Sequence, residues 1–248
     1  MKKKILVALA GFIVFIFFFV LLAPARVVLP WFIQGIPQVA VQGVSGTVWN
    51  TSLDSVLYNG NTINDVAIKT SFWNLLLANL KSDISVNDQN LMLDGRIIVN
   101  SDQLRIEDAR YQLDVSSLQT WLKLPVSELS GSLIGHIDNA VLQIDDLIDL
   151  QANGYWQNAV VGYPNSVLEL GDIHFTIERT EDGKALLTIT NNPGMLDLKG
   201  TLEIALDKKY RLTISTKTDI PSHIKQWLTK LGRTENNRIY IKWNGRLP

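Results

Sequence analysis

The stretch LEIALDKKYRLTI (residues 202–214) decides the fold class of this chain of 248 residues. Apolar side chains alternate with polar ones on both sides of Asp207-Lys208-Lys209, which has the composition of a hairpin turn. Alternation with period two places the apolar side chains on one face of a strand, so that one face is buried and the other is wet. The stretch therefore predicts two antiparallel strands joined by a short turn.

The same alternation begins at residue 39 and continues almost to the end of the chain. Turn sequences separate its segments, for example Asn59-Gly60 and Asp182-Gly183, and both suit hairpins. Crossover helices long enough for parallel pairing are missing from the pattern. We therefore predict a mainly β body built from an antiparallel sheet. The alternating apolar residues include Ile84, Val86, Leu91, Leu93, Ile97, Val99, Leu104, Ile106, Tyr111, Leu113, Val115, Ile173, Phe175, Ile177, Leu202, Ile204, Leu206, Tyr210, Leu212, Ile214, Ile239, Ile241 and Trp243.

Three short helical patterns interrupt the strands, at residues 72–77, 116–125 and 221–232, and each carries a tryptophan. The last aligns Ile224 and Leu228 on one helical face and ends at a glycine. Apolar faces at helical spacing usually belong to a core, so we expect these helices to close the ends of the sheet. Contact of their tryptophans with a partner or a membrane is the alternative.

The chain begins with Lys2, Lys3 and Lys4, followed by the apolar run ILVALAGFIVFIFFFVLL (residues 5–22). At about 1.5 Å per residue, a helix of this length covers most of the roughly 30 Å hydrocarbon core of a bilayer. Lysines before a span hold the N-terminus in the cytoplasm. The sequence thus predicts a single-pass membrane protein whose C-terminal body lies on the far side of the membrane.

A cleaved signal peptide is the competing interpretation, because Ala23-Pro24-Ala25 has the small-x-small form of a cleavage site. The apolar run is longer than the usual 7–15 residues of a signal peptide, and a proline stands inside the site. We therefore favour an uncleaved anchor, and in either case the body leaves the cytoplasm.

These patterns divide the chain into three parts: a basic start and anchor (1–25), a membrane-proximal linker (26–38) and a β domain (39–248). The linker contains two prolines and a glycine and has neither helical nor alternating period. Its Trp31 and Phe32 suit either the lipid headgroups or packing under the first strands.

A glycine beside a hydroxyl residue recurs at the start of three strand patterns, at Gly46, Gly131 and Gly200. The spacing is too irregular for a solenoid of fixed period. It suggests two related halves in one sheet, with a seam near residues 123–130.

All 24 acidic residues follow the anchor, whereas three of the 23 basic residues precede it, so the exported part carries 20 − 24 = −4 charges. Mild acidity argues against a nucleic-acid partner, which needs a basic patch. The chain contains no cysteine, which excludes disulfides and thiolate metal sites.

No pattern of catalytic chemistry stands out in this sequence. The carboxylates of QIDDLIDLQ (residues 143–151) lack the spacing of a calcium loop and suit a solvated turn. Nucleophile elbows, phosphate loops and dinucleotide fingerprints are missing. We therefore expect no enzyme, cofactor or metal site, and a role in binding or assembly. The histidines share no metal-ligand spacing: His136, His174 and His223.

Beyond these generic features, three stretches carry a resemblance to a known family. They are VSGTVWNTSLDSV (44–56), SFWNLLLANLKSDISV (71–86) and the tail, which comprises NNPGMLDLKGTLEI (191–204) and residues 218–248. With the basic start and apolar span, they resemble the type II secretion system protein N family. One departure is Asn50 after Trp49, where the family pattern leads us to expect a glycine soon afterwards.

The resemblance implies an accessory structural component, anchored in the inner membrane, whose periplasmic domain contacts the secretin or the inner-membrane platform. The family is also similar in architecture to AsmA-like proteins, whose curved antiparallel sheets form a groove for lipid. A periplasmic protein that binds phospholipid in such a groove is therefore the alternative. Lys2, Lys3 and Lys4 are expected to set topology, and the residues expected to maintain the fold are Gly46, Trp49, Trp73, Gly200, Trp227 and Gly232.

Overall fold

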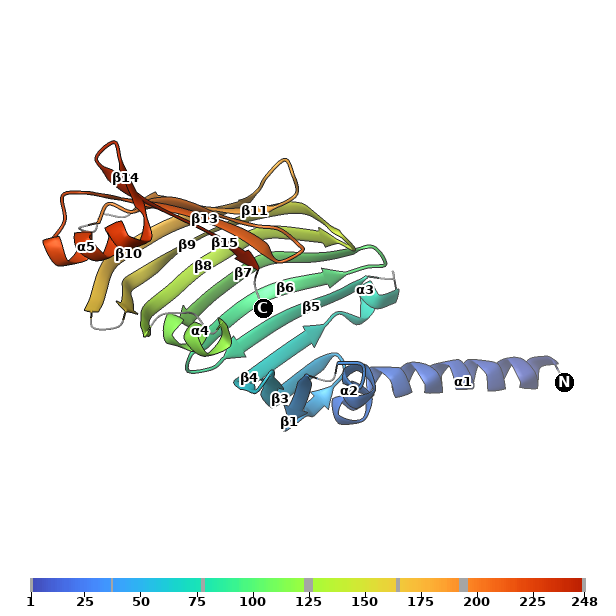
Figure 1. Ribbon diagram of the computed structural model, residues 1–248. Coiled ribbons are helices and arrows are strands. Elements are labelled where there is room, and N and C mark those ends of the chain that lie inside the picture. The colour runs from blue at the N-terminus through green and yellow to red at the C-terminus, as the bar shows by residue number, and fades with distance from the viewer. Residues whose placement is uncertain are drawn as a thin grey trace. The chain divides into compact units, whose positions relative to one another are not determined.

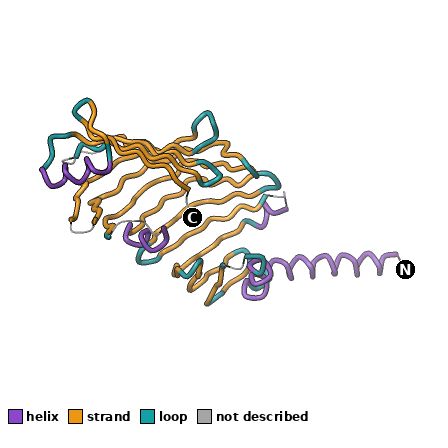
Figure 2. Tube along the Cα trace, in the orientation of Figure 1, coloured by secondary structure: helices purple, strands orange, loops and turns teal. Residues whose placement is uncertain are grey.

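A computed structural model describes residues 2–36, 38–76, 79–122, 127–163, 166–191 and 196–246. The chain divides into two compact units, Met1–Gln89 and Asn90–Pro248. Antiparallel strands dominate both (Figures 1 and 2), which confirms the mainly β prediction. The expected domain boundaries and the seam near residues 123–130 stay predictions, and residues 123–126 lie outside the described residues.

Unit 1 carries a small antiparallel sheet in the order β1-β3-β4-β5, with β2 paired to β3. The Asn59-Gly60 turn joins β3 to β4 as predicted. Both turn residues have positive φ (49° and 83°), which suits the hairpin turns that asparagine and glycine favour. The strands are β1 (Val39–Gln42), β2 (Ser45–Thr47), β3 (Asn50–Tyr58), β4 (Asn61–Thr70) and β5 (Leu80–Asn87).

Two helices precede this sheet, α1 (Lys2–Leu21) and α2 (Ala25–Ile33). Residues 26–33 of the predicted membrane-proximal linker are therefore helical, although their sequence shows no helical period. Pro30 lies inside the helix, where its missing N–H costs one intrahelical hydrogen bond without ending the helix. In the described part of the chain, no helix is both long and apolar enough to cross a membrane, so the predicted span is not confirmed.

Unit 2 contains an antiparallel sheet in the order β6-β7-β8-β9-β10-β11-β12-β13-β15-β14. Strands that follow one another in the chain are neighbours in the sheet as far as β13, so hairpins account for most of the topology (Figure 1). The strands are β6 (Leu91–Val99), β7 (Gln103–Asp114), β8 (Glu128–Gln143), β9 (Asp146–Tyr163), β10 (Ser166–Arg179), β11 (Ala185–Asn191), β12 (Lys199–Ile204), β13 (Lys209–Lys217), β14 (Arg233–Glu235) and β15 (Arg238–Arg246).

The hairpin predicted from residues 202–214 is confirmed in β12 and β13, where Leu202 lies opposite Leu212. Leu206 is the exception, since it lies in the turn and is 47% exposed. The turn closes when the N–H of Lys208 donates to the carbonyl oxygen of Ala205 at 2.9 Å. The alternation therefore ends one apolar residue earlier than the sequence pattern indicates.

The three helical patterns are confirmed as α3 (Phe72–Leu76), α4 (Val115–Leu122) and α5 (Ser222–Leu231). The first two are expected to extend to residues 77 and 125, which lie outside the described residues.

Helix α5 contributes to the main core of unit 2. Its Ile224 and Leu228 are buried in one cluster with Leu170 and Ile173 of β10 and Ile239 of β15. Three strands separate β10 from β15 in the sheet order, yet both contact this cluster. The sheet of unit 2 is therefore folded around α5, which agrees with the expected role of this helix in closing an end of the sheet.

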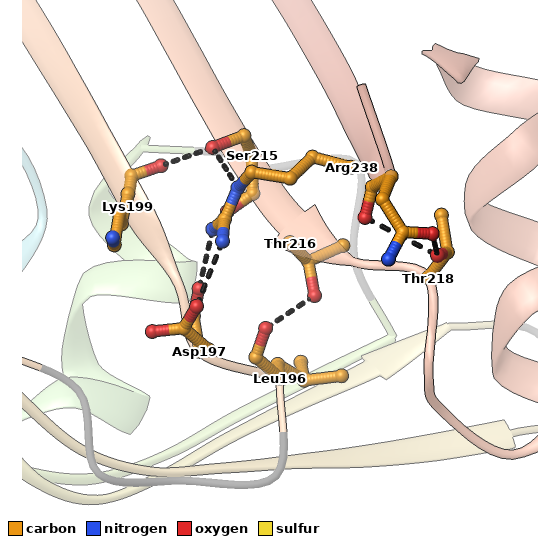
Figure 3. A network of polar contacts seen from close by, with 8 residues as sticks. Leu196, Asp197, Lys199, Ser215, Thr216, Thr218 and Arg238 are labelled. Carbon is orange, nitrogen blue, oxygen red and sulfur yellow. Dashed lines mark hydrogen bonds and ion pairs between the residues drawn. The ribbon is translucent and has the colours of Figure 1, made fainter. Parts of the chain in front are cut away.

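A polar network centred on Arg238 holds the segment before β12 against β13 and β15 (Figure 3). The guanidinium donates to Asp197 Oδ2 at 2.7 Å, to the Asp197 carbonyl oxygen at 2.6 Å and to Ser215 Oγ at 3.1 Å. Beside it, the Thr216 hydroxyl donates to the carbonyl oxygen of Leu196 at 2.5 Å. The Arg238 side chain is 19% exposed and the Asp197 side chain 45% exposed, so these charge-assisted bonds lie at the protein surface with the guanidinium partly buried.

Replacing Leu228 by alanine should lower the free energy of unfolding by about 2–5 kcal/mol, because it leaves a cavity between α5 and β15. Urea unfolding of the full chain, followed by circular dichroism, measures this change. The control is Lys225→Ala on the exposed side of the same helix, which should stay within about 0.5 kcal/mol. Equal effects of the two variants would contradict the assigned core.

Stability should also depend on the charge of Asp197 at low pH. The hydrogen bond from Arg238 holds the pKa of the Asp197 carboxyl below its ordinary value. This contribution is full above the pKa of the unfolded chain, about 3.9, and disappears as the pH falls through the lower folded pKa. In Asp197→Asn, the stability near pH 7 should fall, and the difference from the wild type should shrink as the pH drops below about 4.

The matched control for this pH series is Asp182→Asn, which removes an exposed ion pair with Lys184 at 3.5 Å. Surface pairs of this kind contribute at most about 1 kcal/mol. If Asp197→Asn gives the same pH profile as the wild type, the network does not stabilise the fold through this charge.

Candidate functional site

An aromatic cluster joins the end of α1 to the sheet of unit 1. Phe72, the first residue of α3, packs edge-on against Phe17 of α1 and against Trp49, with ring centroids 5.8 and 4.9 Å apart. Trp49 also donates from Nε1 to the carbonyl oxygen of Val20 at 3.0 Å. One turn of α1 is thereby tied to two segments that lie roughly 30 and 50 residues further along the chain.

Helices α2 and α3 of unit 1 also carry large apolar side chains that are exposed. Trp73 follows Phe72 on α3 and is 70% exposed, with its ring 5.4 Å from that of Phe72. On α2, Trp31 and Phe32 are 75% and 74% exposed. We call Trp31, Phe32 and Trp73 the aromatic rim. Large aromatic side chains that stay exposed on two short helices are candidates for an interaction surface.

The three tryptophans that are expected to maintain the fold lie in different environments in the structure. Trp49 is half-buried in the aromatic cluster, and Trp227 is partly buried against the core of unit 2. The interpretation of Trp73 as a core residue is wrong, because α3 is short and leaves this ring on the surface. The importance of the three residues for domain integrity stays a prediction.

Close backbone contacts explain the three glycines expected to maintain the fold. Gly46 has φ +83°, and a Cβ there would collide with the carbonyl oxygen of Asn50. A Cβ at Gly200 would meet the carbonyl oxygen of Thr213 in the neighbouring strand. Gly232 ends α5 with extended backbone, and a Cβ would collide with the Tyr240 carbonyl. At Gly200 and Gly232 a side chain is excluded by the close neighbouring backbone, and neither residue has a left-handed backbone conformation.

The side chains of Lys2, Lys3 and Lys4 lie outside the described residues, so their expected effect on topology stays a prediction. The side chain of His223 is likewise not described.

The remaining titratable residues of interest are dispersed. His136 Nε2 lies 3.2 Å from Asp138 Oδ1, whereas His174 stacks on Tyr155 with centroids 5.6 Å apart. In the QIDDLIDLQ stretch, Asp149 accepts a hydrogen bond from the Asn139 amide at 2.7 Å. Within the described ranges, no group of three or more His, Asp or Glu side chains could hold a metal ion.

An open hollow of about 500 Å³ lies over the middle of β6–β9. Its lining brings His136 near Tyr111, whose burial raises the pKa of the phenol above its ordinary value. A phenol with a raised pKa is a poorer base near neutral pH. Gly135 and Gly154 leave room beneath the rings of Tyr111 and Phe175, so the hollow reflects the packing of the sheet.

The end of the sheet in unit 2 presents a partly open strand. One side of β15 pairs with β13 along its whole length, from Arg238 to Arg246. The other side pairs with β14 only at residues 238–240. Among the described residues, no strand covers the outer side of residues 241–246. We call these six residues the open edge. Its exposed side chains are Lys242, Trp243, Asn244 and Arg246.

Charge and apolar surface lie on opposite faces of the open edge. Trp243, which lies opposite Leu212 and is 47% exposed, shares one face with Ile241. Lys242 and Arg246 lie on the other face, because side chains alternate along a strand. The strand order determines this site, and the alternation of the sequence alone does not reveal it.

Comparisons with known proteins agree with the resemblance drawn from the sequence. The family described as "Type II secretion system (T2SS), protein N" matches residues 37–243. A protein of Aeromonas hydrophila named "Type II secretion system protein N" is 22% identical over 257 residues, covering 100% of both chains. No solved structure matches the chain.

Neither match names an AsmA-like or lipid-binding protein, so the alternative of a lipid groove receives no support from the comparisons. The family match extends over most of the chain, from the end of the predicted linker to β15. The chain therefore belongs to the type II secretion system protein N family.

Proposed function

We propose that this protein is an accessory structural component of the type II secretion system. In this proposal α1 is retained in the inner membrane, the N-terminus is cytoplasmic, and the β body lies in the periplasm. Family membership supports the assignment to the secretion machinery. The lysines and the apolar run at the start of the chain support the topology.

The open edge of β15 is the observation that supports contact with another component of the secretion system. Strand residues that pair on one side only leave alternate N–H and C=O groups directed outwards. An extended segment of another protein can pair with such groups and add a strand to the sheet. Six consecutive residues, 241–246, are long enough to hold such a segment in register.

The side chains of the open edge define what kind of segment fits it. Lys242 and Arg246 lie on one face, and no acidic residue follows Glu235 in the chain. A partner strand with acidic side chains on this face and an apolar side chain beside Trp243 would complement both faces. We therefore propose that the partner is an acidic, extended segment of the secretin or of the inner-membrane platform.

A photo-crosslinking amino acid placed at Trp243 should capture another secretion component in cells that are exporting protein. The matched control is position 211 in β13, which is exposed but lies in a strand paired on both sides. Mass spectrometry of the captured product identifies the partner, and we expect a product at position 243 and none at position 211.

Cross-links of equal yield at positions 243 and 211 would show that contact is not made through the open edge. Recovery of no secretion component at either position, in a strain with active export, would argue against an assembly role for the protein.

A further inference from the structure

We propose that α2 and α3 dock on the surface of the lipid bilayer beside α1, with the aromatic rim at the level of the headgroups. This inference rests on the proposed function, in which α1 lies in the inner membrane. It adds a second point of membrane contact, about 50 residues from the span, within unit 1.

The aromatic cluster sets the height of α3 relative to α1. Phe72 packs on Phe17, which lies four residues before the end of α1 at Leu21. At about 1.5 Å per residue, this contact lies about 6 Å back from the end of the helix. Helix α3 is therefore level with the last turn of α1. If α1 spans the bilayer, that turn reaches the boundary between hydrocarbon and headgroups.

The exposed residues of α3 suit this boundary. Trp73 is 70% exposed and Leu75 is 46% exposed, so both would otherwise face water. Tryptophan is enriched at membrane interfaces because its ring is apolar while its N–H can donate a hydrogen bond. The Trp73 ring, which contacts Phe72 edge-on, is placed to enter the headgroup region.

Helix α2 presents a similar surface directly after α1. Its Val27, Trp31 and Phe32 are 52%, 75% and 74% exposed. The opposite side is fixed to the sheet, because Ala25 is buried and Pro24 forms a β-bridge with Thr47. The helix thus has one side bound to the protein and one apolar side without cover among the described residues.

Charge favours a lipid surface as the occupant of the aromatic rim. The chain has no Asp or Glu in residues 1–53 or in residues 66–82, which contain α2 and α3. Both stretches carry basic residues, among them the exposed Arg26 and Lys69. Amphipathic helices with aromatic and basic residues bind anionic bilayers through apolar burial and electrostatic attraction together. Continuity of the chain with the proposed span keeps these helices at the membrane.

The test uses single-cysteine variants of the full chain, which has no native cysteine. Trp73→Cys and Trp31→Cys report on the aromatic rim, Phe19→Cys reports on α1, and Thr62→Cys in β4 is the exposed control. Each variant is labelled with an environment-sensitive fluorophore and reconstituted in phosphatidylethanolamine–phosphatidylglycerol vesicles. Lipids that carry a nitroxide near the headgroup then quench labels within the interface.

Quenching at positions 73 and 31 should exceed quenching at position 62 about 5-fold, because interfacial helices bury their apolar face 5–10 Å into the boundary. Circular dichroism of each variant checks folding, and the exposure of the replaced side chains favours its preservation. Quenching at position 19 with none at 73 and 31 would overturn the docking and leave the span intact. A lack of quenching at position 19 would instead overturn the proposed span, whatever the rim shows.

A protein partner on the aromatic rim is the competing outcome. It would appear as labels at 73 and 31 that stay unquenched in vesicles but cross-link to another protein in cells, and this result would also overturn the inference.

Discussion

The packing of α5 inside the folded sheet is the interaction on which unit 2 depends. An antiparallel sheet buries one face only if something covers it, and hairpins alone cannot supply that cover. Leu228 and Ile224 bring β10 and β15 to one cluster although three strands separate them. The Arg238 network then fixes the segment that leads into β12 against β13 and β15. Apolar burial closes the sheet, and the partly exposed Arg238–Asp197 ion pair ties this segment to the strands at the closure.

Local pattern was sufficient to predict most of the fold. Alternation and turn composition predicted hairpins such as that of β12 and β13, and helical spacing with a terminal glycine predicted α5. Helix α2 is not predicted by the sequence pattern, because residues 26–38 contain two prolines and a glycine and show no helical period, whereas a short helix tolerates Pro30. The sequence also does not predict where an individual side chain lies within the folded unit. An apolar ring at helical spacing, such as Trp73, can lie in a core or on a surface, and its neighbours in space decide which.

The candidate sites were less predictable than the fold, because each depends on residues far apart in the chain. Arg238 contacts Asp197 across 41 positions, and Phe72 meets Phe17 across 55, without any shared local motif. The open edge depends on strand order, since the last hairpin places β14 outside β15 and leaves most of β15 uncovered. The resemblance to the family indicates a role in secretion, but the surfaces proposed for this role are visible only in the three-dimensional structure.

An uncovered edge strand can pair with the edge strand of any other sheet, including that of a second copy of the same chain. The charge on β15 opposes that outcome. Antiparallel pairing of two copies would bring Lys242 and Arg246 of one chain near the same residues of the other, and like charges across a strand pair are destabilising. An acidic partner segment would not be repelled in this way. Lys242 and Arg246 therefore disfavour self-association and favour pairing with an acidic segment. The short β14 has the same effect, because it covers part of the edge and limits pairing to six residues.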